Sequence, residues 1–528
     1  MSELTATSTL VRFILRCDRI RIAVWIAAIG ALMLTTVASV KGIYPTQATL
    51  ERSAAAAEDN AAVIALNGPA IGLRTLGGRV AFESGTLGLV VTALMSVLMV
   101  GRHTRAEEES GRVELVRAAV VGRYAPMAAA LVVVVAMNVA VGVVVAIGLI
   151  GLDLPTTGSL VFGASFTALG LVFAGVAGVT AQVTENTRVV YGAGGALLGL
   201  AFALRAIGDS SDATLSWLSP IGWVQASRAY AGERWWPLAL ALSVAVVLVV
   251  GARALAARRD LGAGLVAPRP GPPVASSRLT SPFGLAFRLQ RGSLVGWSAG
   301  LFLGGASYGS LGDAIEELVR DNPTLNDVFT ASGGTSLTDS FFGNAMLIMA
   351  LIGSGYAIQS AQRLRGDEAS QLVEALLATA VSRVAWAAGH LTVALAGSVV
   401  VLGATGLGAG VAFAIVSGDA SQVPRLFGAA LVHAPAVWVL VGLVVALFGL
   451  APRAVVAAWA AFGLCLVIGM LGQVLDLPGW LTTVSPFEHT PQLPAADLTL
   501  APLAILIAVA AGLVALGLAG FLRRDLAG

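Results

Sequence analysis

The chain has 528 residues, of which 57% are hydrophobic and only 12% are charged, and its mean hydropathy is +0.85. A soluble protein of this length would fold as several domains with far more surface charge, so the composition excludes that class. The formal net charge of +2 gives no sign of a nucleic-acid partner, and none is expected.

Apolar runs long enough to cross a bilayer recur along the whole chain. In lipid a segment must satisfy its own backbone hydrogen bonds, and runs of about 18 or more apolar residues do so as helices. The sequence therefore predicts an all-α, polytopic membrane protein with about 12 transmembrane helices. The predicted spans are residues 22–40, 85–101, 125–150, 160–183, 189–206, 237–256, 294–311, 342–359, 384–416, 426–450, 455–474 and 500–522.

The basic residues lie mostly on one side of this predicted layout. With the N-terminus assigned to the cytoplasm, 23 of the 32 lie on the inner side, as the positive-inside rule requires. Both termini are therefore expected in the cytoplasm, and the polar lead before the first span is too long for a cleaved signal peptide. One lysine against 31 arginines is typical of a GC-rich genome and hence of a bacterial inner (cytoplasmic) membrane. The nine basic residues assigned to the outer side are Lys41, Arg52, Arg74, Arg79, Arg205, Arg228, Arg234, Arg320 and Arg425.

The chain contains an internal repeat. The sequence Arg-Arg-Asp-Leu follows the sixth predicted span, at residues 258–261, and the twelfth, at residues 523–526. The loops 105–123 and 365–383 align without a gap. Because each half has an even number of spans, the halves are predicted to be parallel six-helix repeats. The predicted domains are a first half, 1–266, a Pro-rich cytoplasmic linker, 267–282, and a second half, 283–528.

The two aligned loops are rich in acidic residues with apolar residues between them. On one continuous helix, Glu107, Glu108, Gly111 and Glu114 lie at i, i+1, i+4 and i+7, so the acids gather on one side. Such a helix would dock in a groove on a cytoplasmic partner, and the alternative is a solvated acidic loop. The candidate docking residues are Arg105, Glu107, Glu108, Gly111, Glu114, Arg365, Asp367, Glu368 and Glu374. The apolar stripes beside them are Val113, Val116 and Val120 in the first loop and Leu372, Val373, Leu376 and Leu377 in the second.

The sequence lacks the motifs that nucleotide binding, metal binding and ion-coupled transport would require. A Walker A loop needs a lysine that reaches the phosphates, and the one lysine, Lys41, lies in no such motif. The Cys and His residues do not have the spacing of a metal site. Every Asp and Glu is expected in a loop or at a span end, which argues against ion-coupled transport. His390 and His433 fall within predicted spans. Each could relay protons, but we favour the alternative that each is a neutral side chain hydrogen-bonded between helices.

The pattern Glu-Glu-x-x-Gly-x-x-Glu-Leu, from Glu107 to Leu115, resembles the loop between the second and third spans of ABC-2 type transporter permeases. The run 219–238 and the two Arg-Arg-Asp-Leu ends are similar to those of fused twelve-span actinobacterial exporters of polyketide antibiotics, the tetronasin-type group. The second half departs from this pattern, because Gln371 stands where the first has Gly111 and residues 485–503 lack the Trp-rich run. The two docking sites are therefore expected to be unequal.

This resemblance implies a permease subunit that exports amphiphilic drugs, antibiotics or lipid-like molecules. The power would come from two copies of a separately encoded ATP-binding cassette subunit, on which ATP and Mg would be bound. The chain itself would be no enzyme and would hold no cofactor, and its loops 105–123 and 365–383 would be the coupling helices. Its remaining partners would be membrane lipid and the transported small molecule.

Four tryptophans cluster in the predicted outer loop before the sixth span. An aromatic belt at the membrane interface explains most such residues, and an outer gate for the substrate is the alternative. The residues are Trp217, Trp223, Trp235 and Trp236.

Two other functional classes remain as alternatives. An ion-coupled secondary multidrug transporter of major-facilitator-like layout also has two parallel six-span repeats, but the missing intramembrane acids argue against it. A membrane-embedded enzyme would need clustered polar catalytic residues near one face, and the sequence offers none.

Overall fold

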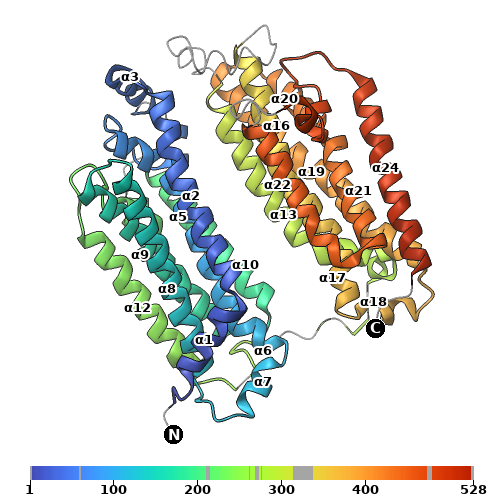
Figure 1. The fold of residues 1–528 in the computed structure, drawn as a ribbon, viewed down its shortest axis with the longest axis horizontal. Helices are drawn as coiled ribbons and strands as arrows, with labels where there is room; N and C mark the ends of the chain where they lie inside the picture. The colour runs from blue at the N-terminus through green and yellow to red at the C-terminus, as the bar shows by residue number, and fades with distance from the viewer. Residues whose placement is uncertain are drawn as a thin grey trace. The chain divides into compact units, whose positions relative to one another are not determined.

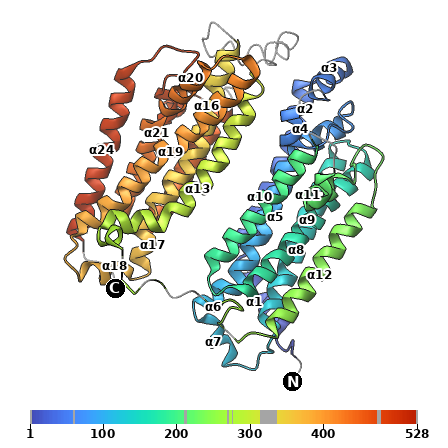
Figure 2. The ribbon, with the colours of Figure 1, turned by 180° about the vertical axis from the view of Figure 1, so that it is seen from behind.

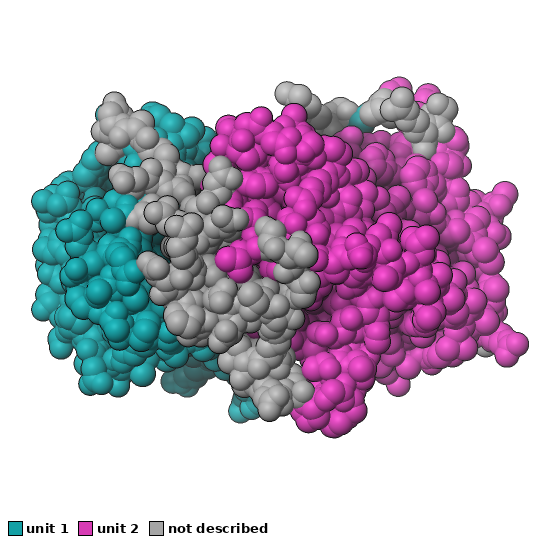
Figure 3. All heavy atoms as spheres, turned by 90° about the horizontal axis from the view of Figure 1, so that it is seen from above, with its two compact units in different colours: residues 1–271 teal, residues 272–528 magenta. Residues whose placement is uncertain are grey.

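The computed structural model of the protein describes residues 3–58, 61–209, 214–260, 262–267, 271, 273–274, 276–312, 337–471 and 478–524. Every regular element within these ranges is a helix, which confirms the all-α prediction. The chain divides into two compact units, Met1–Gly271 (unit 1) and Pro272–Gly528 (unit 2), which are coloured separately in Figure 3. The boundary falls inside the predicted linker 267–282, whose residues 268–270, 272 and 275 lie outside the described residues.

In unit 1 each of the six predicted spans corresponds to one long helix (Figures 1 and 2). These helices are α2 (Arg19–Ile43), α5 (Leu76–Gly101), α8 (Ala125–Gly151), α9 (Thr156–Val183), α10 (Thr187–Asp209) and α12 (Trp236–Ala256). The shorter elements are α1 (Thr7–Cys17), α3 (Gln47–Glu58), α4 (Ala61–Asn67), η1 (Arg102–Ala106), α6 (Glu107–Glu109), α7 (Arg112–Arg117), η2 (Leu215–Leu218) and α11 (Pro220–Gln225).

Helix α9 packs against α5, α8, α10 and α12 and forms the centre of unit 1. Its aromatic residues Phe162, Phe166 and Phe173 are buried in the core of the unit. α8 and α9 approach closely where Gly142 faces Gly163. A Cβ atom on Gly142 would lie 2.6 Å from the carbonyl oxygen of Gly163, and one on Gly163 would lie 2.3 Å from that of Gly142. Only glycine fits at such a contact between two helix backbones.

Unit 2 is built from a second set of long helices (Figure 1). They are α13 (Pro282–Gly309), α16 (Leu337–Ala361), α19 (Arg383–Ser417), α20 (Gln422–Leu431), α21 (Ala434–Leu450), α22 (Ala458–Leu471) and α24 (Leu500–Arg523). The shorter elements are η3 (Ser277–Thr280), α17 (Arg363–Ala369), α18 (Leu372–Leu377), η4 (Pro452–Ala457), α23 (Gly479–Thr482) and η5 (Pro486–His489). The predicted span 426–450 runs through α20 and α21, which separate just before Pro435. The last residues of the predicted span 455–474 lie outside the described residues.

Eleven helical segments within the described residues are long and apolar enough to cross a membrane, so the chain is a multi-pass membrane protein. Helix α13, which contains most of the predicted span 294–311, is not among the eleven, because glycines and serines lower its hydropathy. It packs closely against α19, where a Cβ atom on Gly305 would lie 2.1 Å from the carbonyl oxygen of Thr405.

Two ion pairs of unit 1 lie within long helices, near the helix ends. Helix α5 begins at Leu76, well before the predicted span, and includes Arg79 and Glu83, whose Nε and Oε1 atoms are 2.7 Å apart. Arg205 is fully buried in α10, 3.6 Å from Asp209. Glu83 lies in the first turns of α5 and Asp209 is the last residue of α10, so both carboxylates lie near a helix end and each is paired with an arginine of its own helix.

Candidate functional site

We call the end of each unit that carries the loop after its second long helix the loop end. In unit 1, α5 continues through η1 into α6, and the chain then turns at Gly111 before α7. In unit 2, α16 is followed by α17, and the chain turns at Gln371 before α18. The prediction of one continuous helix is therefore wrong, since each loop contains two short helices separated by a turn. Glu107 and Glu108 lie on α6, whereas Glu114 lies on α7.

The two turns have the same backbone conformation although their residues differ. Gly111 has φ +73° and Gln371 has φ +59°, both in the left-handed region. Glycine adopts this region freely, whereas another L-residue pays roughly 1–2 kcal/mol. A Cβ atom at Gly111 would meet no other atom within 4 Å, so the backbone angle rather than space favours glycine there. The repeat has thus kept its backbone geometry where its sequence has changed.

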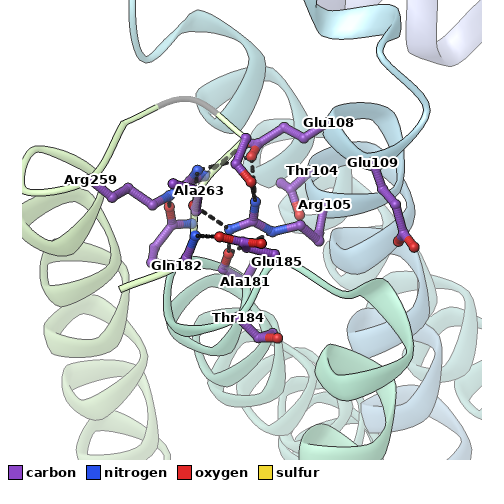
Figure 4. A network of polar contacts seen from close by, with 12 residues as sticks. Thr104, Arg105, Glu108, Glu109, Ala181, Gln182, Thr184, Glu185, Arg259 and Ala263 are labelled. Carbon is purple, nitrogen blue, oxygen red and sulfur yellow. Dashed lines mark hydrogen bonds and ion pairs between the residues drawn. The ribbon is translucent and has the colours of Figure 1, made fainter. Parts of the chain in front are cut away.

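A network of charged groups fixes the loop to the rest of unit 1 (Figure 4). Arg105 is 1% exposed and donates to the carbonyl oxygen of Ala181, at the end of α9, over 2.6 and 3.1 Å. It also donates to Glu108 over 2.8 Å. From the other side Arg259 donates to both carboxylate oxygens of Glu108, over 2.7 and 2.9 Å, and to Gln182 Oε1 over 2.7 Å. Glu108 therefore lies between two guanidinium groups, in charge-assisted bonds of the stronger kind.

The same network anchors the chain that leaves α12. Arg105 donates to the carbonyl oxygens of Gly262 and Ala263, each over 3.2 Å. The backbone N–H groups of Leu265 and Val266 then donate to the carbonyl oxygens of residues 182 and 183 over 3.1 and 3.0 Å. Hydrogen bonds thus hold residues 262–266 beside the end of α9.

Unit 2 has an equivalent cluster around Glu368. This carboxylate is 3.2 Å from Arg365 Nη1 and accepts two hydrogen bonds from Arg524, over 2.7 and 2.9 Å. The guanidinium of Arg524 lies over the rings of Phe448 and Phe521, with 4.9 and 5.4 Å to the ring centroids. The two units therefore share an Arg–Glu–Arg arrangement in which the third residue follows the last long helix.

The aligned pair Arg123 and Arg383 has a matching role in the two units. Arg123 donates to the carbonyl oxygens of Ala256, Ala257 and Arg259, at the end of α12, over 3.2–3.4 Å. Arg383 donates to the carbonyl oxygen of Arg524, after α24, over 2.9 Å. Each arginine satisfies carbonyl groups that a helix C-terminus leaves without an intrahelical partner.

The other predicted docking residues differ in how far they are exposed to solvent. Glu107 is half-buried, 3.6 Å from Arg112, and Asp367 is buried, 2.8 Å from Arg363. Glu114 and Glu374, by contrast, are exposed on α7 and α18.

The predicted apolar stripes do not form one continuous surface. Val113 and Val373 are buried within their own units, at 7% and 1% exposure, whereas Val120 and Leu372 are exposed. Leu376 and Leu377 are half-buried against the core of unit 2, and the side chain of Val116 lies outside the described residues.

Sequence reasoning gave no role to Arg259, Arg524 or Asp18. The first two belong to the Arg-Arg-Asp-Leu repeats. Because each copy directly follows the last span of its half, this recurrence indicates a shared role for the two arginines. Asp18 lies between α1 and α2 and accepts hydrogen bonds from Arg102 over 2.7 and 3.2 Å. Burial raises the pKa of Asp18, but the hydrogen bond and positive charge of Arg102 outweigh this and hold that pKa below its ordinary value.

Both histidines that the sequence places in spans are buried and bonded to neighbouring side chains. His390 Nδ1 is 3.3 Å from the amide nitrogen of Gln290, and its Nε2 is 3.5 Å from Asp367. His433 Nδ1 is 2.9 Å from Thr490 Oγ1. The placement of each histidine beside a polar partner agrees with the favoured interpretation of a hydrogen-bonded side chain between helices.

The structure brings three of the four candidate tryptophans together at the end of unit 1 opposite the loop end. The rings of Trp217 and Trp236 stack with centroids 5.3 Å apart, and Trp223 Nε1 donates to the carbonyl oxygen of Trp217 over 2.6 Å. Trp235 is half exposed and lines an apolar groove of about 670 Å³ between α8, α9 and α12. Aromatic side chains at the end of membrane-spanning helices are typical of an interface belt.

Comparison with known proteins agrees with the description of a membrane-spanning chain. The family described as multidrug efflux system permease Rv1217c, C-terminal domain, matches residues 279–522. The whole chain is similar to the multidrug efflux system permease protein Rv1217c of Mycobacterium tuberculosis (strain ATCC 25618 / H37Rv). The two are 41% identical over 527 residues, which cover 99% of this chain and 96% of that protein. The chain therefore belongs to the family of multidrug efflux system permeases that includes Rv1217c.

Proposed function

We propose that the chain is the membrane-spanning permease subunit of an ATP-driven exporter of the ABC-2 type, close to the tetronasin-type group. It exports amphiphilic drugs, antibiotics or lipid-like molecules across the bacterial inner membrane, and two copies of a separately encoded ATP-binding subunit power it. Its termini and loop ends face the cytoplasm, as the basic residues indicate. The name of its relative supports drug efflux as the transport activity.

The observation that carries this proposal is the construction of the two loops. Each is fixed at its base by an Arg–Glu–Arg cluster, around Glu108 and around Glu368, while Glu114 and Glu374 remain exposed at its tip. A loop that is rigid at its base transmits displacement, whereas a loosely held loop would absorb it. Two such loops in one chain support two copies of the moving partner.

The alternative, an ion-coupled secondary transporter, gains one supporting observation. Asp367 is 4% exposed and lies 3.5 Å from His390 at the start of α19. A buried carboxylate beside a histidine is an arrangement that can exchange a proton during transport.

Reconstitution in proteoliposomes separates these two mechanisms. The chain is co-expressed with an ATP-binding subunit encoded in the same genome, and drug efflux is measured with ATP while an ionophore collapses the proton gradient. We expect efflux to persist, two copies of the subunit to co-purify, and no ATP hydrolysis by the chain alone. Efflux that needs the gradient, needs no partner, and stops in Asp367→Asn and His390→Ala would establish the secondary transporter instead.

Variants of the loop tips test the docking role directly. Because Glu114 and Glu374 are exposed, Glu114→Ala and Glu374→Ala should leave the chain folded and inserted. If each carboxylate becomes buried against a basic residue of the partner, its loss costs about 2–5 kcal/mol of binding. We expect reduced co-purification of the ATP-binding subunit and reduced drug resistance of the host. Full resistance and normal complex yield in the double variant would show that these acids only face solvent.

A further inference from the structure

The repeated Arg-Arg-Asp-Leu sequence has a structural counterpart in both units. Its second arginine, Arg259 in unit 1 and Arg524 in unit 2, reaches back to the carboxylate of the loop, Glu108 or Glu368. These partners are 151 and 156 residues apart in the sequence. The bonds therefore join two segments that are far apart in the sequence, namely the loop and the end of the last long helix.

The geometry of the two contacts is nearly identical. In each unit the Nη1 and Nη2 atoms of the arginine donate to the two oxygens of the carboxylate, over 2.7 and 2.9 Å. The side chains of Arg259 and Arg524 are 8% and 19% exposed, and those of Glu108 and Glu368 are 12% and 3% exposed. This fork-to-fork arrangement fixes the direction of the two groups as well as their distance.

Unit 1 shows why this contact matters for movement of the loop. A cavity of about 540 Å³ opens between the loop, α8 and the end of α12, and Glu108 and Arg259 both line it. Across that space the loop is not packed solidly against α12. The paired charges therefore supply a direct connection where apolar packing is incomplete.

We propose that Arg259 and Arg524 are positioning residues that carry displacement of the loop to the last span of each unit, α12 and α24. When the ATP-binding subunit moves a loop, the bidentate bond moves the last helix with it. This inference rests on the proposed function and adds to it the residues that transmit the motion. The first arginine of each repeat, Arg258 or Arg523, is exposed and is not part of the contact.

The test uses the full chain in complex with its ATP-binding subunit, in proteoliposomes with a fluorescent drug. Arg259→Ala and Arg524→Ala are compared with the matched controls Arg258→Ala and Arg523→Ala. The number of drug molecules exported per ATP hydrolysed should fall by about tenfold in the first pair, the size expected for loss of a charge-assisted hydrogen bond. The controls should keep the ratio of the unmodified complex.

Two further measurements separate transmission from a merely structural role. A lysine keeps the charge but cannot form the bidentate contact, so Arg259→Lys and Arg524→Lys should restore folding yield while recovering only part of the transport ratio. In a double-mutant cycle, Glu108→Gln and Arg259→Ala together should lower the ratio by less than the sum of their separate effects, because both changes remove the bond between Glu108 and Arg259.

The outcomes distinguish this inference from the function on which it rests. If the unmodified complex shows no ATP-dependent efflux, the proposed function fails and this inference with it. If that complex is active and Arg259→Ala and Arg524→Ala keep the ratio of their controls, the inference alone is wrong. It is also wrong if the lysine variants fully restore the ratio, or if the Glu108 and Arg259 effects add.

Discussion

Arg105 and Arg365 occupy aligned positions, yet their surroundings differ. The Arg105 side chain is 1% exposed and binds three backbone carbonyl groups besides Glu108, whereas the Arg365 side chain is 35% exposed. The alignment of the loops predicted that these residues correspond. It could not predict their burial, because the groups that cover Arg105 come from residues 181 and 262–263, far away in the sequence. Side-chain burial depends on which segments the fold brings over a residue.

This difference leads to a prediction about stability. Arg105→Ala removes one partner of a buried network and should cost about 3–5 kcal/mol, whereas Arg365→Ala should cost about 1 kcal/mol or less. The measurement is the thermal unfolding midpoint of the purified chain in detergent, with Arg365→Ala as the matched control. Equal shifts in the two variants would show that the carbonyl contacts of Arg105 do not contribute as described.

The loops also show how a residue exchange can leave geometry unchanged. Sequence comparison suggested unequal docking sites because Gln371 replaces Gly111. Both residues have positive φ angles, so the backbone of the two turns gives no reason for that inequality. A residue-by-residue pattern cannot reveal this, because the cost of a left-handed glutamine is small enough for surrounding contacts to offset it.

At the scale of elements, hydropathy predicted the long helices well and their ends less well. Apolar length places α8 and α12 almost at their observed bounds. It misses the first turns of α5, since Arg79 and Glu83 are polar but neutralise one another inside the helix. It also treated residues 107–114 as one helix, since the periodicity of acids continues through the turn at Gly111. An ion pair determines where α5 begins, and a backbone angle determines where the loop helix breaks. Neither can be read from a hydropathy pattern.

The contact between α8 and α9 gives a prediction at this scale. A Cβ atom on Gly142 would lie 2.2 Å from Thr167 Oγ1 and 2.6 Å from the carbonyl oxygen of Gly163, so Gly142→Ala should force the helices apart. Overpacking of this kind costs about 1–3 kcal/mol. Gly151→Ala, at the end of the same helix, meets nothing within 4 Å and is the control. Thermal unfolding in detergent should show a lower midpoint for Gly142→Ala, and equal midpoints would contradict the close packing of these helices.

At the scale of the whole molecule, the orientation in the membrane can be measured directly. In a Cys17→Ser and Cys465→Ser background, a cysteine at Thr157, exposed at the start of α9, should react with a membrane-impermeant thiol reagent added to intact cells. A cysteine at Gly366, exposed on α17 beside the loop of unit 2, should react only after the cells are opened. The reverse labelling pattern would place the loop ends and both termini outside.

The anchoring of residues 262–266 along the end of α9 also fixes the point at which the chain leaves unit 1. Arg105 and two backbone hydrogen bonds hold these residues against α9, although they follow α12 in the sequence. The linker therefore starts from the end of α9, at the base of the loop, rather than from the end of α12.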